Sequence, residues 1–395
     1  MRVIFVFLLT LPILFFTPEQ SAGQDETLAY KSFKFAGIPI LKYDADDGFG
    51  YGARLDLYNF SEGGYSPYYY LIELQLFAST GGKREFWLFF DSPHLLKNNQ
   101  RITGELRYAK SNYAPYFGLG QTADYDENVT DKSHAQFANE DYYTYQRTRK
   151  SLRLDYQHKF KLASFLAGFS LNYTTIELND DPTLLSLQFD ESKNESEFTN
   201  AIKLGFIFDN RDFEAAPSKG LWSEAIFEIF HKNLGSDYTF SRLTLAHRQY
   251  HNFLKNFVFA HRYIYSNTWG DFPFYERQFM SSSYRIEEAG GGAKSIRGVM
   301  KNRFIGRQWL LGNLELRFKF YKFQAKNQDF ELAIATFYDF GGAWEKEEPV
   351  SIKDLHAGRG AGLQMTWNKN FILSIDGAIS EEVNLGLYIG LGYLF

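Results

Sequence analysis

Apolar and polar residues alternate at nearly every step along most of this chain, and this two-residue period constrains its fold more than any other feature. In the segment 314–320, hydrophobic residues at every second position are separated by Glu315, Arg317 and Lys319. Successive side chains of a β-strand point to opposite faces, so a strand would gather the apolar groups on one face and the charges on the other. A helix would spread the same charges around its axis. The pattern therefore predicts an all-β protein.

Two architectures can use strands of this kind. In a soluble sandwich the polar face meets water, whereas in an outer-membrane barrel the apolar face meets lipid and the polar face lines the interior. The alternating segments extend over about 10–14 residues, against about 5–6 in an ordinary strand. Aromatic residues make up 18% of the 395 residues, and many stand near segment ends, where Tyr and Trp anchor at a membrane interface. Both features favour the barrel.

Sixteen alternating segments are predicted, and the connections between them sort by parity. The segments begin near Phe33, Gly50, Tyr68, Arg84, Arg101, Tyr143, Leu162, Asn200, Gly220, Tyr238, Phe253, Gln308, Glu331, His356, Asn370 and Asn384. The long connections, at 111–141, 179–198, 267–307 and 341–355, all follow odd-numbered segments. Bacterial outer-membrane barrels have long outer loops, short periplasmic turns and an even number of strands. We therefore predict a single 16-stranded antiparallel transmembrane β-barrel over residues 33–395.

The N-terminus has the features of a secretory signal peptide. Arg2 supplies a positive charge, and the apolar run 3–16 is shorter than the roughly 20 residues that span a bilayer. Small residues then precede a cleavage site expected near Gly23. We expect residues 1–23 to be removed and residues 24–32 to form a short periplasmic segment before the barrel. A retained N-terminal anchor is the alternative.

The composition excludes several classes of function. With 42 Lys and Arg, 47 Asp and Glu and no basic block, the chain is not expected to bind nucleic acid. The absence of cysteine excludes disulfides, thiolate metal sites and a thiol nucleophile. His247 and His251 are four residues apart, but on a strand this spacing is not expected to hold a metal. Without a Gly-x-Ser-x-Gly elbow we expect no enzyme and no cofactor.

An acidic run occupies the first outer connection of the predicted barrel. Asp44, Asp46 and Asp47 could bind calcium or cations that bridge lipopolysaccharide. A solvated acidic loop is the alternative that we favour.

Three stretches in the C-terminal half carry motifs beyond simple alternation. The first is a structured turn with a cluster of acids and bases, the second is a glycine-rich stretch of the longest connection, and the third ends a strand. They comprise Asp209, Arg211, Asp212, Pro217 and Gly220; Gly290–Gly298, with Ile296, Arg297 and Gly298 at its end; and Phe337–Trp344, which contains Asp339.

In this order the three motifs resemble those of the outer-membrane assembly-factor and two-partner-secretion transporter superfamily, the bacterial surface antigen family. The resemblance is clear over residues 203–395 and weaker over 33–178. Like that family, the chain ends in an aromatic residue, Phe395, which with Tyr393 would form a C-terminal assembly signal. The alternation places both rings on the apolar outward face of the last strand.

The resemblance implies that the sixth outer loop folds back into the barrel lumen. Arg297, between Ile296 and Gly298, would then pair with Glu315 on the twelfth strand and Asp339 on the thirteenth. We call these five residues the loop latch. The charge pattern agrees, because Glu315 lies on the inward face and a guanidinium can bind carboxylates through two parallel hydrogen bonds. A solvated Arg297 is the alternative.

Two sequence features of this chain bear on how the sixth loop would pack in the lumen. Val299 stands where the family has an aromatic residue, so the loop tip is expected to pack differently. Gly358, Gly360 and Gly362 are expected to make room inside the lumen for the loop, because glycine allows close approach of another chain.

The resemblance implies a role in inserting or translocating proteins or lipids at the bacterial outer membrane. About ten residues separate the expected signal peptide from the first strand, too few for the periplasmic polypeptide-transport-associated domains of the family. We therefore expect outer-membrane lipid and a separate periplasmic partner or assembly machinery as partners. The glycine-rich last strand is compatible with the weak barrel closure of family members that insert proteins. A passive solute channel, or a structural or surface-recognition protein, are the alternatives.

Overall fold

The computed structural model describes residues 31–395 except 45–47, 66, 97–98, 122, 179–181, 190–194, 285–286, 289, 326–327 and 368–370. The expected signal peptide, residues 1–23, and the first part of the short segment 24–32 lie outside the described residues. So do Asp46 and Asp47 of the acidic run. Within the described residues, no helix is long and apolar enough to cross a bilayer.

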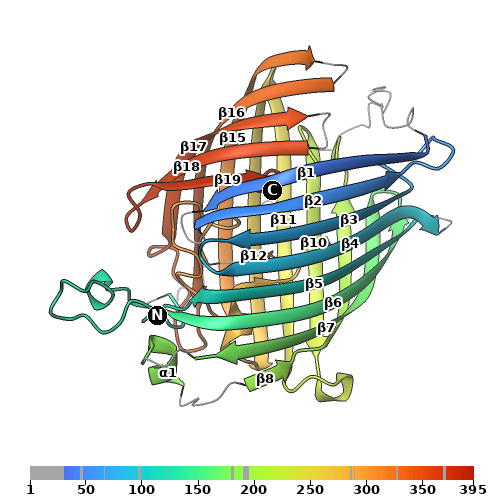
Figure 1. Ribbon diagram of the computed structural model, residues 1–395. Helices are drawn as coiled ribbons and strands as arrows, with labels where there is room; N and C mark the ends of the chain where they lie inside the picture. The colour runs from blue at the N-terminus through green and yellow to red at the C-terminus, as the bar shows by residue number, and fades with distance from the viewer. Residues whose placement is uncertain are drawn as a thin grey trace, which may run out of the picture.

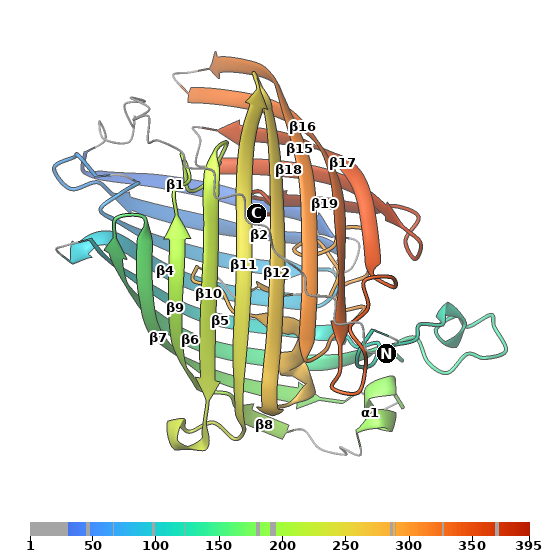
Figure 2. The ribbon, with the colours of Figure 1, turned by 180° about the vertical axis from the view of Figure 1, so that it is seen from behind.

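One large antiparallel sheet makes up most of the molecule (Figures 1 and 2). Its strands are β1 (Phe33–Asp44), β2 (Gly48–Asn59), β3 (Tyr70–Ser79), β4 (Lys83–Leu96), β5 (Gln100–Pro115), β6 (Thr144–Phe160), β7 (Ala163–Glu177), β8 (Glu195–Phe198), β9 (Ala201–Asp209), β10 (Gly220–Phe230), β11 (Thr239–Leu254), β12 (Phe257–Asp271), β15 (Gln308–Ala325), β16 (Gln328–Trp344), β17 (His356–Trp367), β18 (Phe371–Ser380) and β19 (Gly386–Leu391).

Two of these strands share one position in the sheet. The short β8 pairs with the end of β7, and β9 pairs with the beginning of the same strand. The sheet therefore has sixteen strand positions, which confirms the predicted number. The predicted starting points lie close to the observed ones, and the largest difference is that between Phe253 and Phe257 at β12.

The connections between the strands contain several short elements of secondary structure. They are the 3₁₀ turns η2 (Glu127–Val129), η3 (Lys232–Leu234) and η4 (Phe274–Gln278), the helix α1 (Leu184–Gln188), and the two-residue pair β13 (Phe279–Met280) and β14 (Glu287–Glu288).

The alternation seen in the sequence separates two faces of the sheet. On β9, Ile202 and Leu204 are 42% and 41% exposed, whereas Lys203 between them is only 3% exposed. On β15, Leu316 and Phe318 are exposed, whereas Glu315 and Arg317 are buried. The exposed face is thus apolar and the buried face carries the charges, the reverse of a water-soluble protein.

The strands follow one another around the sheet, each paired with its neighbours in the chain. Strands β1–β7 form the near wall in Figure 1, and β9–β12 form the near wall in Figure 2. The pairing returns to its start, because β1 pairs with β19, although only at Asp44–Tyr388 among the described residues. By contrast, β1 and β2 are paired at every residue of β1.

The long connections meet at one end of the sheet. The Asn139 side-chain amide donates a hydrogen bond to the Pro182 carbonyl at 2.9 Å, which joins the β5–β6 and β7–β8 connections. Arg277 pairs with Glu345 at 2.7 Å, which joins the β12–β15 and β16–β17 connections. Several strands extend further toward this end than the sequence predicted: β16 continues through the glycines after Asp339 as far as Trp344.

We predict that a charge on the exposed apolar face destabilises the protein in a bilayer. Leu204→Arg on β9 should cost about 2–4 kcal/mol of unfolding free energy if the site lies near the bilayer midplane, because the exposed face is expected to meet acyl chains. Chemical unfolding in lipid vesicles measures the change.

Leu187→Arg is the matched control, because Leu187 is 65% exposed on α1, outside the sheet. Equal effects of the two substitutions would show that the exposed apolar face does not meet lipid.

Candidate functional site

The connection between β12 and β15, residues 272–307, packs against the charged face of the sheet. We call it the sixth loop. Ile296, Val299 and Phe304 of this loop are at most 1% exposed. They form one apolar cluster with inward residues of the wall, including Leu311 and Ala343. A solvated loop would leave these side chains in water, so burial of apolar surface holds the loop against the wall.

The guanidinium of Arg297 lies among carboxylates of three strands. Its Nε and Nη2 donate to the two Asp339 oxygens at 2.8 and 3.1 Å. Its Nη1 donates to Glu315 at 3.2 Å and to Asp376 at 3.2 Å. Arg297 is 1% exposed, so these bonds replace all the water that its charge would otherwise bind. The structure thus brings Arg297, Glu315 and Asp339 together and adds Asp376 of β18.

Asp376 was not predicted from the sequence, although a signal was present. Leu373 and Ile375 alternate with Ser374 and Asp376 on β18, so the period alone places this carboxylate on the inward face. Which inward carboxylates meet Arg297 depends on strand register and on the curvature of the sheet, neither of which the pattern contains.

The backbone around Arg297 is also fixed. The Arg297 N–H donates to Asp339 at 3.1 Å, and the Gly298 N–H donates to the Tyr388 hydroxyl at 3.0 Å. A Cβ at Gly358 would collide with the Arg297 carbonyl oxygen. This glycine therefore makes room for the loop tip. Ile296, on the other side of Arg297, is fully buried.

Glu315 serves two cations. It accepts from Arg317 of its own strand at 2.6 Å and from the Gln364 amide at 3.1 Å, in addition to its bond from Arg297. The Arg297 guanidinium lies 3.4 Å from the centre of the Phe337 ring, a cation–π contact in a site without water access. The polar groups of the latch are therefore enclosed by protein on every side.

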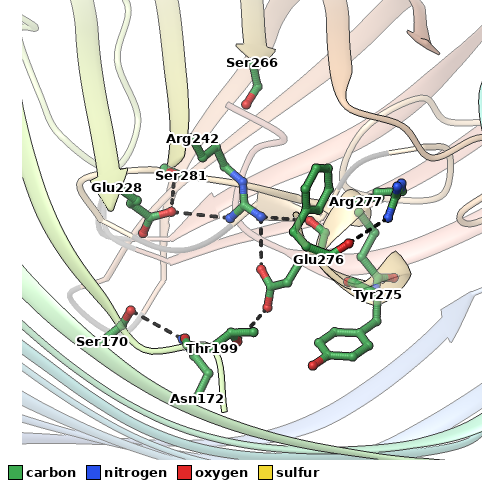
Figure 3. A network of polar contacts seen from close by, with 12 residues as sticks. Ser170, Asn172, Thr199, Glu228, Arg242, Ser266, Tyr275, Glu276, Arg277 and Ser281 are labelled. Atoms are coloured by element: carbon green, nitrogen blue, oxygen red, sulfur yellow. Dashed lines mark hydrogen bonds and ion pairs between the residues drawn. The ribbon is translucent and has the colours of Figure 1, made fainter. Parts of the chain in front are cut away.

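A second anchor of the sixth loop is made with strands that do not carry the latch (Figure 3). Glu276 of η4 accepts from Arg149 at 2.6 Å, from the Thr199 hydroxyl at 3.0 Å and from Arg242 at 3.0 Å. Burial opposes ionisation of Glu276, but Arg149 and Arg242 outweigh it and lower its pKa to about 2. Arg242 also reaches Glu228 at 3.4 Å. Glu276 was not predicted as a site residue, because a lone acid in an aromatic stretch has no spacing signal.

The turn between β9 and β10 holds the predicted acid–base motif. Arg211 makes two bonds to Asp209, at 2.9 and 2.6 Å. The Asp212 carboxylate accepts the backbone N–H groups of Phe213, Ser218 and Lys219 at 2.8–3.1 Å, which closes the turn.

Two further residues of this turn shape its backbone. Pro217 is buried, and Gly220 has φ +95°, in the left-handed region. A side chain at Gly220 would meet the backbone of Asn210. All five motif residues therefore belong to one turn, at the end of the sheet opposite to the long connections.

The C-terminal residues depart from the predicted alternation. Strand β19 ends at Leu391, and Gly392 turns the chain with φ +85°. The Arg317 guanidinium then lies 3.8 Å from the centre of the Tyr393 ring and donates to the Phe395 carbonyl at 3.2 Å. The prediction that Tyr393 and Phe395 continue the outward apolar face was therefore wrong. Strand β19 ends before Tyr393 and Phe395, and an inward arginine, Arg317, contacts the Tyr393 ring and the main chain of Phe395.

The histidine pair lies on the exposed face of the sheet. The ring centre of His261 on β12 lies 5.8 Å from that of His247, at a tilted angle, and 5.7 Å from that of His251, on which it stacks. No group of three or more His, Cys, Asp or Glu in the described part of the chain has a metal-binding arrangement.

Comparison with known proteins matches most of the chain to one family. The model of the Omp85 superfamily domain matches residues 71–393. No match was found among curated proteins.

Two solved structures share the fold. BamA from Haemophilus ducreyi lacking POTRA domains 1–3 has a TM-score of 0.57 and 15% identity, over 92% of this chain and 70% of that chain. CdiB from Escherichia coli has a TM-score of 0.57 and 11% identity, over 92% of this chain and 63% of that chain. The chain thus spans less than two thirds of the length of CdiB.

Replacing Arg297 with alanine should release the loop tip. Removing one partner of a buried ion pair typically costs about 3–5 kcal/mol, which corresponds to a roughly hundredfold or larger rise in the undocked population. Limited trypsinolysis within residues 291–305, and the gel mobility of unheated samples, measure the release.

Arg359→Ala is the control for this substitution, because Arg359 is exposed on β17 next to Gly358. If Arg297→Ala matches wild type in both assays, Arg297 does not hold the loop.

The Glu276 anchor should weaken in acid. Its folded-state pKa, about 2, lies below the ordinary value of 4.5, so its stabilisation is present above pH 4.5 and is lost as the pH falls through about 2. Glu276→Gln should therefore lower the unfolding free energy by roughly 3 kcal/mol at pH 7, with the difference from wild type shrinking toward pH 2. Glu347→Gln, at an exposed acid of the β16–β17 connection, is the control. A difference that does not change with pH would contradict the ionised anchor.

Proposed function

The chain belongs to the Omp85 superfamily, and on this premise we propose that it assists the insertion or translocation of proteins or lipids at the bacterial outer membrane. The superfamily implies an outer-membrane location, and its assembly and transport barrels are non-enzymatic. BamA and CdiB share the fold of this chain, at 15% and 11% identity. Their own activities are a guide to the class of function and not to its substrate.

We propose that residues 33–395 form a closed barrel whose lumen is plugged by the sixth loop. The apolar exposed face and the buried charged face support the barrel, since lipid outside and polar groups inside are the arrangement that strands require in a bilayer. Arg297 and Glu276 of the sixth loop contact residues of different strands. These contacts support a loop that is held across the interior by the latch and by a second anchor. Residues 24–32 would lie on the periplasmic side after removal of the signal peptide.

The short pairing between β1 and β19 is the observation that most supports a role in insertion. It has the single pair Asp44–Tyr388 in the described residues, whereas the neighbouring β18–β19 pair extends from Leu373–Leu391 to Ala378–Gly386. Unpaired backbone groups are costly in lipid, so an incoming strand would gain hydrogen bonds by adding to this junction. A weak junction between otherwise well-paired strands would give an inserting β-strand protein or lipid a place to enter.

The alternatives make different demands on the same structure. A passive solute channel needs an open lumen, but the buried sixth loop lies against the inward faces of β11, β12 and β15. Surface recognition has one observation in its favour: the connection 116–143 extends away from the sheet in both views (Figures 1 and 2). A periplasmic partner and contact with outer-membrane lipid are part of the proposal for insertion.

Purified protein in lipid vesicles tests the function directly. We expect vesicles that contain it to speed the folding of a urea-denatured outer-membrane β-barrel compared with empty vesicles. A cross-link between Asp44→Cys and Tyr388→Cys should abolish the effect, and reduction should restore it, because residues paired across strands are close enough for a disulfide. The natural chain has no cysteine, so the cross-link is unique.

Two controls accompany the cross-link. The Ala361→Cys and Gly377→Cys pair bridges β17 and β18 at a regular position, and Tyr388→Cys alone reports the loss of the bond to Gly298. Vesicles that show a large steady conductance and no folding activity would identify a solute channel. A cross-linked protein as active as the reduced one would exclude the β1–β19 junction as the site of action.

A further inference from the structure

A group of polar side chains interrupts the apolar exposed face of the sheet. Its members are Ser223 of β10, His247, Gln249 and His251 of β11, and His261 of β12, and we call them the histidine patch. The strand register places Ser223 opposite His247 and Gln249 opposite His261, so the five residues form one continuous area. A polar group that faces acyl chains is costly unless it has a hydrogen-bond partner. A ligand that accepts hydrogen bonds would remove this cost.

The hydrogen bonds inside the patch leave donors for such a ligand on two histidines. Ser223 Oγ and His247 Nδ1 are 2.7 Å apart, and the Gln249 side chain hydrogen-bonds the same ring. The Nδ1 of His261 is buried without a hydrogen-bond partner among the described residues. An unpaired buried N–H is rarer than an unpaired acceptor, so a neutral His261 should carry its proton on Nε2. This N–H and the exposed ring of His251 are the donors that a ligand could use.

No acid stands near the patch on the exposed face. Among the residues that β9–β12 and β15 present on this face, the only acid is Asp271, at the far end of β12. Lys255, in the turn between β11 and β12, is exposed and makes no ion pair with a described residue. The lysine would attract an anion, and no carboxylate of this face is close enough to repel it.

Apolar side chains flank the patch along the strands. Phe253 and Phe259 lie toward the β11–β12 turn, where the Phe259 ring stacks on His251 with ring centres 6.4 Å apart. Leu245 and Tyr263, both 43% exposed, continue the face toward the middle of the strands. The turn is at the end of the sheet opposite to the long connections, which in the proposed barrel is the periplasmic edge of the bilayer. A matching ligand is therefore amphipathic, with its polar head near the turn.

We propose that the histidine patch binds the headgroup phosphate of a phospholipid in the periplasmic leaflet. A phosphodiester is an anion at neutral pH, and its unesterified oxygens accept hydrogen bonds from His251 and His261 while Lys255 supplies positive charge. Hydrogen bonds to an ionised acceptor are stronger than those between neutral groups, and more so away from water. The acyl chains would then follow Leu245 and Tyr263. This inference rests on the proposed contact of the exposed face with lipid, and not on the insertion function.

Native mass spectrometry of the full chain in dodecyl maltoside, with added phosphatidylglycerol, tests the proposal. We expect one lipid molecule per chain to be retained more tightly than any others. His251→Leu and His261→Leu should each weaken its retention by roughly tenfold or more, because each removes a hydrogen bond to a charged group. Leucine already occupies this face at Leu245, so neither change should damage the fold. Thermal unfolding without added lipid checks this.

His158→Leu is the matched control. His158 is an outward residue of β6, on the same face as the exposed Leu154 and close to the same end of the sheet. In the strand order β6 is separated from β11 by β7, β9 and β10, so His158 is not part of the patch. This substitution should leave lipid retention unchanged.

Two competitors identify the part of the lipid that is recognised. Diacylglycerol has the acyl chains without the phosphate, and glycerophosphoglycerol has the headgroup without the chains. We expect neither to displace the bound lipid at concentrations at which phosphatidylglycerol does. Diacylglycerol retained as tightly would show that the phosphate is not recognised, and full competition by glycerophosphoglycerol would identify a site for soluble anions; either result would overturn the proposal.

Two results with the variants would also overturn it. One is equal lipid retention by wild type, His251→Leu and His261→Leu. The other is a two-chain species that both substitutions abolish, since the patch would then be an interface between copies of the chain. Failure of this site alone would leave the different effects of Leu204→Arg and Leu187→Arg in vesicles intact, so it is distinguishable from failure of the lipid-facing barrel.

Discussion

Arg297 places a full positive charge where water does not reach, and the interior of the sheet is organised around its neutralisation. Asp339, Glu315 and Asp376 come from β16, β15 and β18, so one loop residue connects three strands of the sheet. In such surroundings an unpaired charge is far costlier than in water. The three strands must therefore keep their register for the loop to stay docked, and the loop must stay docked for their carboxylates to remain paired.

The sixth loop has two such anchors with apolar packing between them. Glu276 meets Arg149 of β6 and Arg242 of β11, strands that do not carry the latch. Ile296, Val299 and Phe304 fill the space between wall and loop. Ion pairs fix orientation and apolar contacts supply most of the burial energy, so the combination specifies one docked position. Val299, fully buried in this cluster, replaces the aromatic residue of the family without leaving the tip exposed.

Hydrogen bonding between neighbouring strands is regular around the sheet except at the junction of β1 and β19. Each neighbouring pair of long strands is hydrogen-bonded along most of its length, but β1 and β19 meet at one residue pair among those described. The chain after Leu391 turns inward, and Arg317 binds Tyr393 and the Phe395 carbonyl there. Residues that would lengthen the last strand thus make contacts on the inward side instead. Inward arginines act at both places: Arg317 binds the C-terminal residues, and Arg149 and Arg242 bind Glu276 of the sixth loop.

The two-residue period by itself determined the sixteen strands, their approximate starts, and which residues face inward, because side chains of a strand alternate whatever the surroundings. Glu315 and Arg317 were placed on the charged face on this ground alone, whereas Asp339 was expected there from the family resemblance. The period could not show that Asp376 meets Arg297, that Glu276 is bound by Arg149 and Arg242, or that β19 stops at Leu391. Those contacts join strands separated by tens of residues or more, and they depend on register and curvature. Only the folded sheet brings such distant groups within hydrogen-bonding distance.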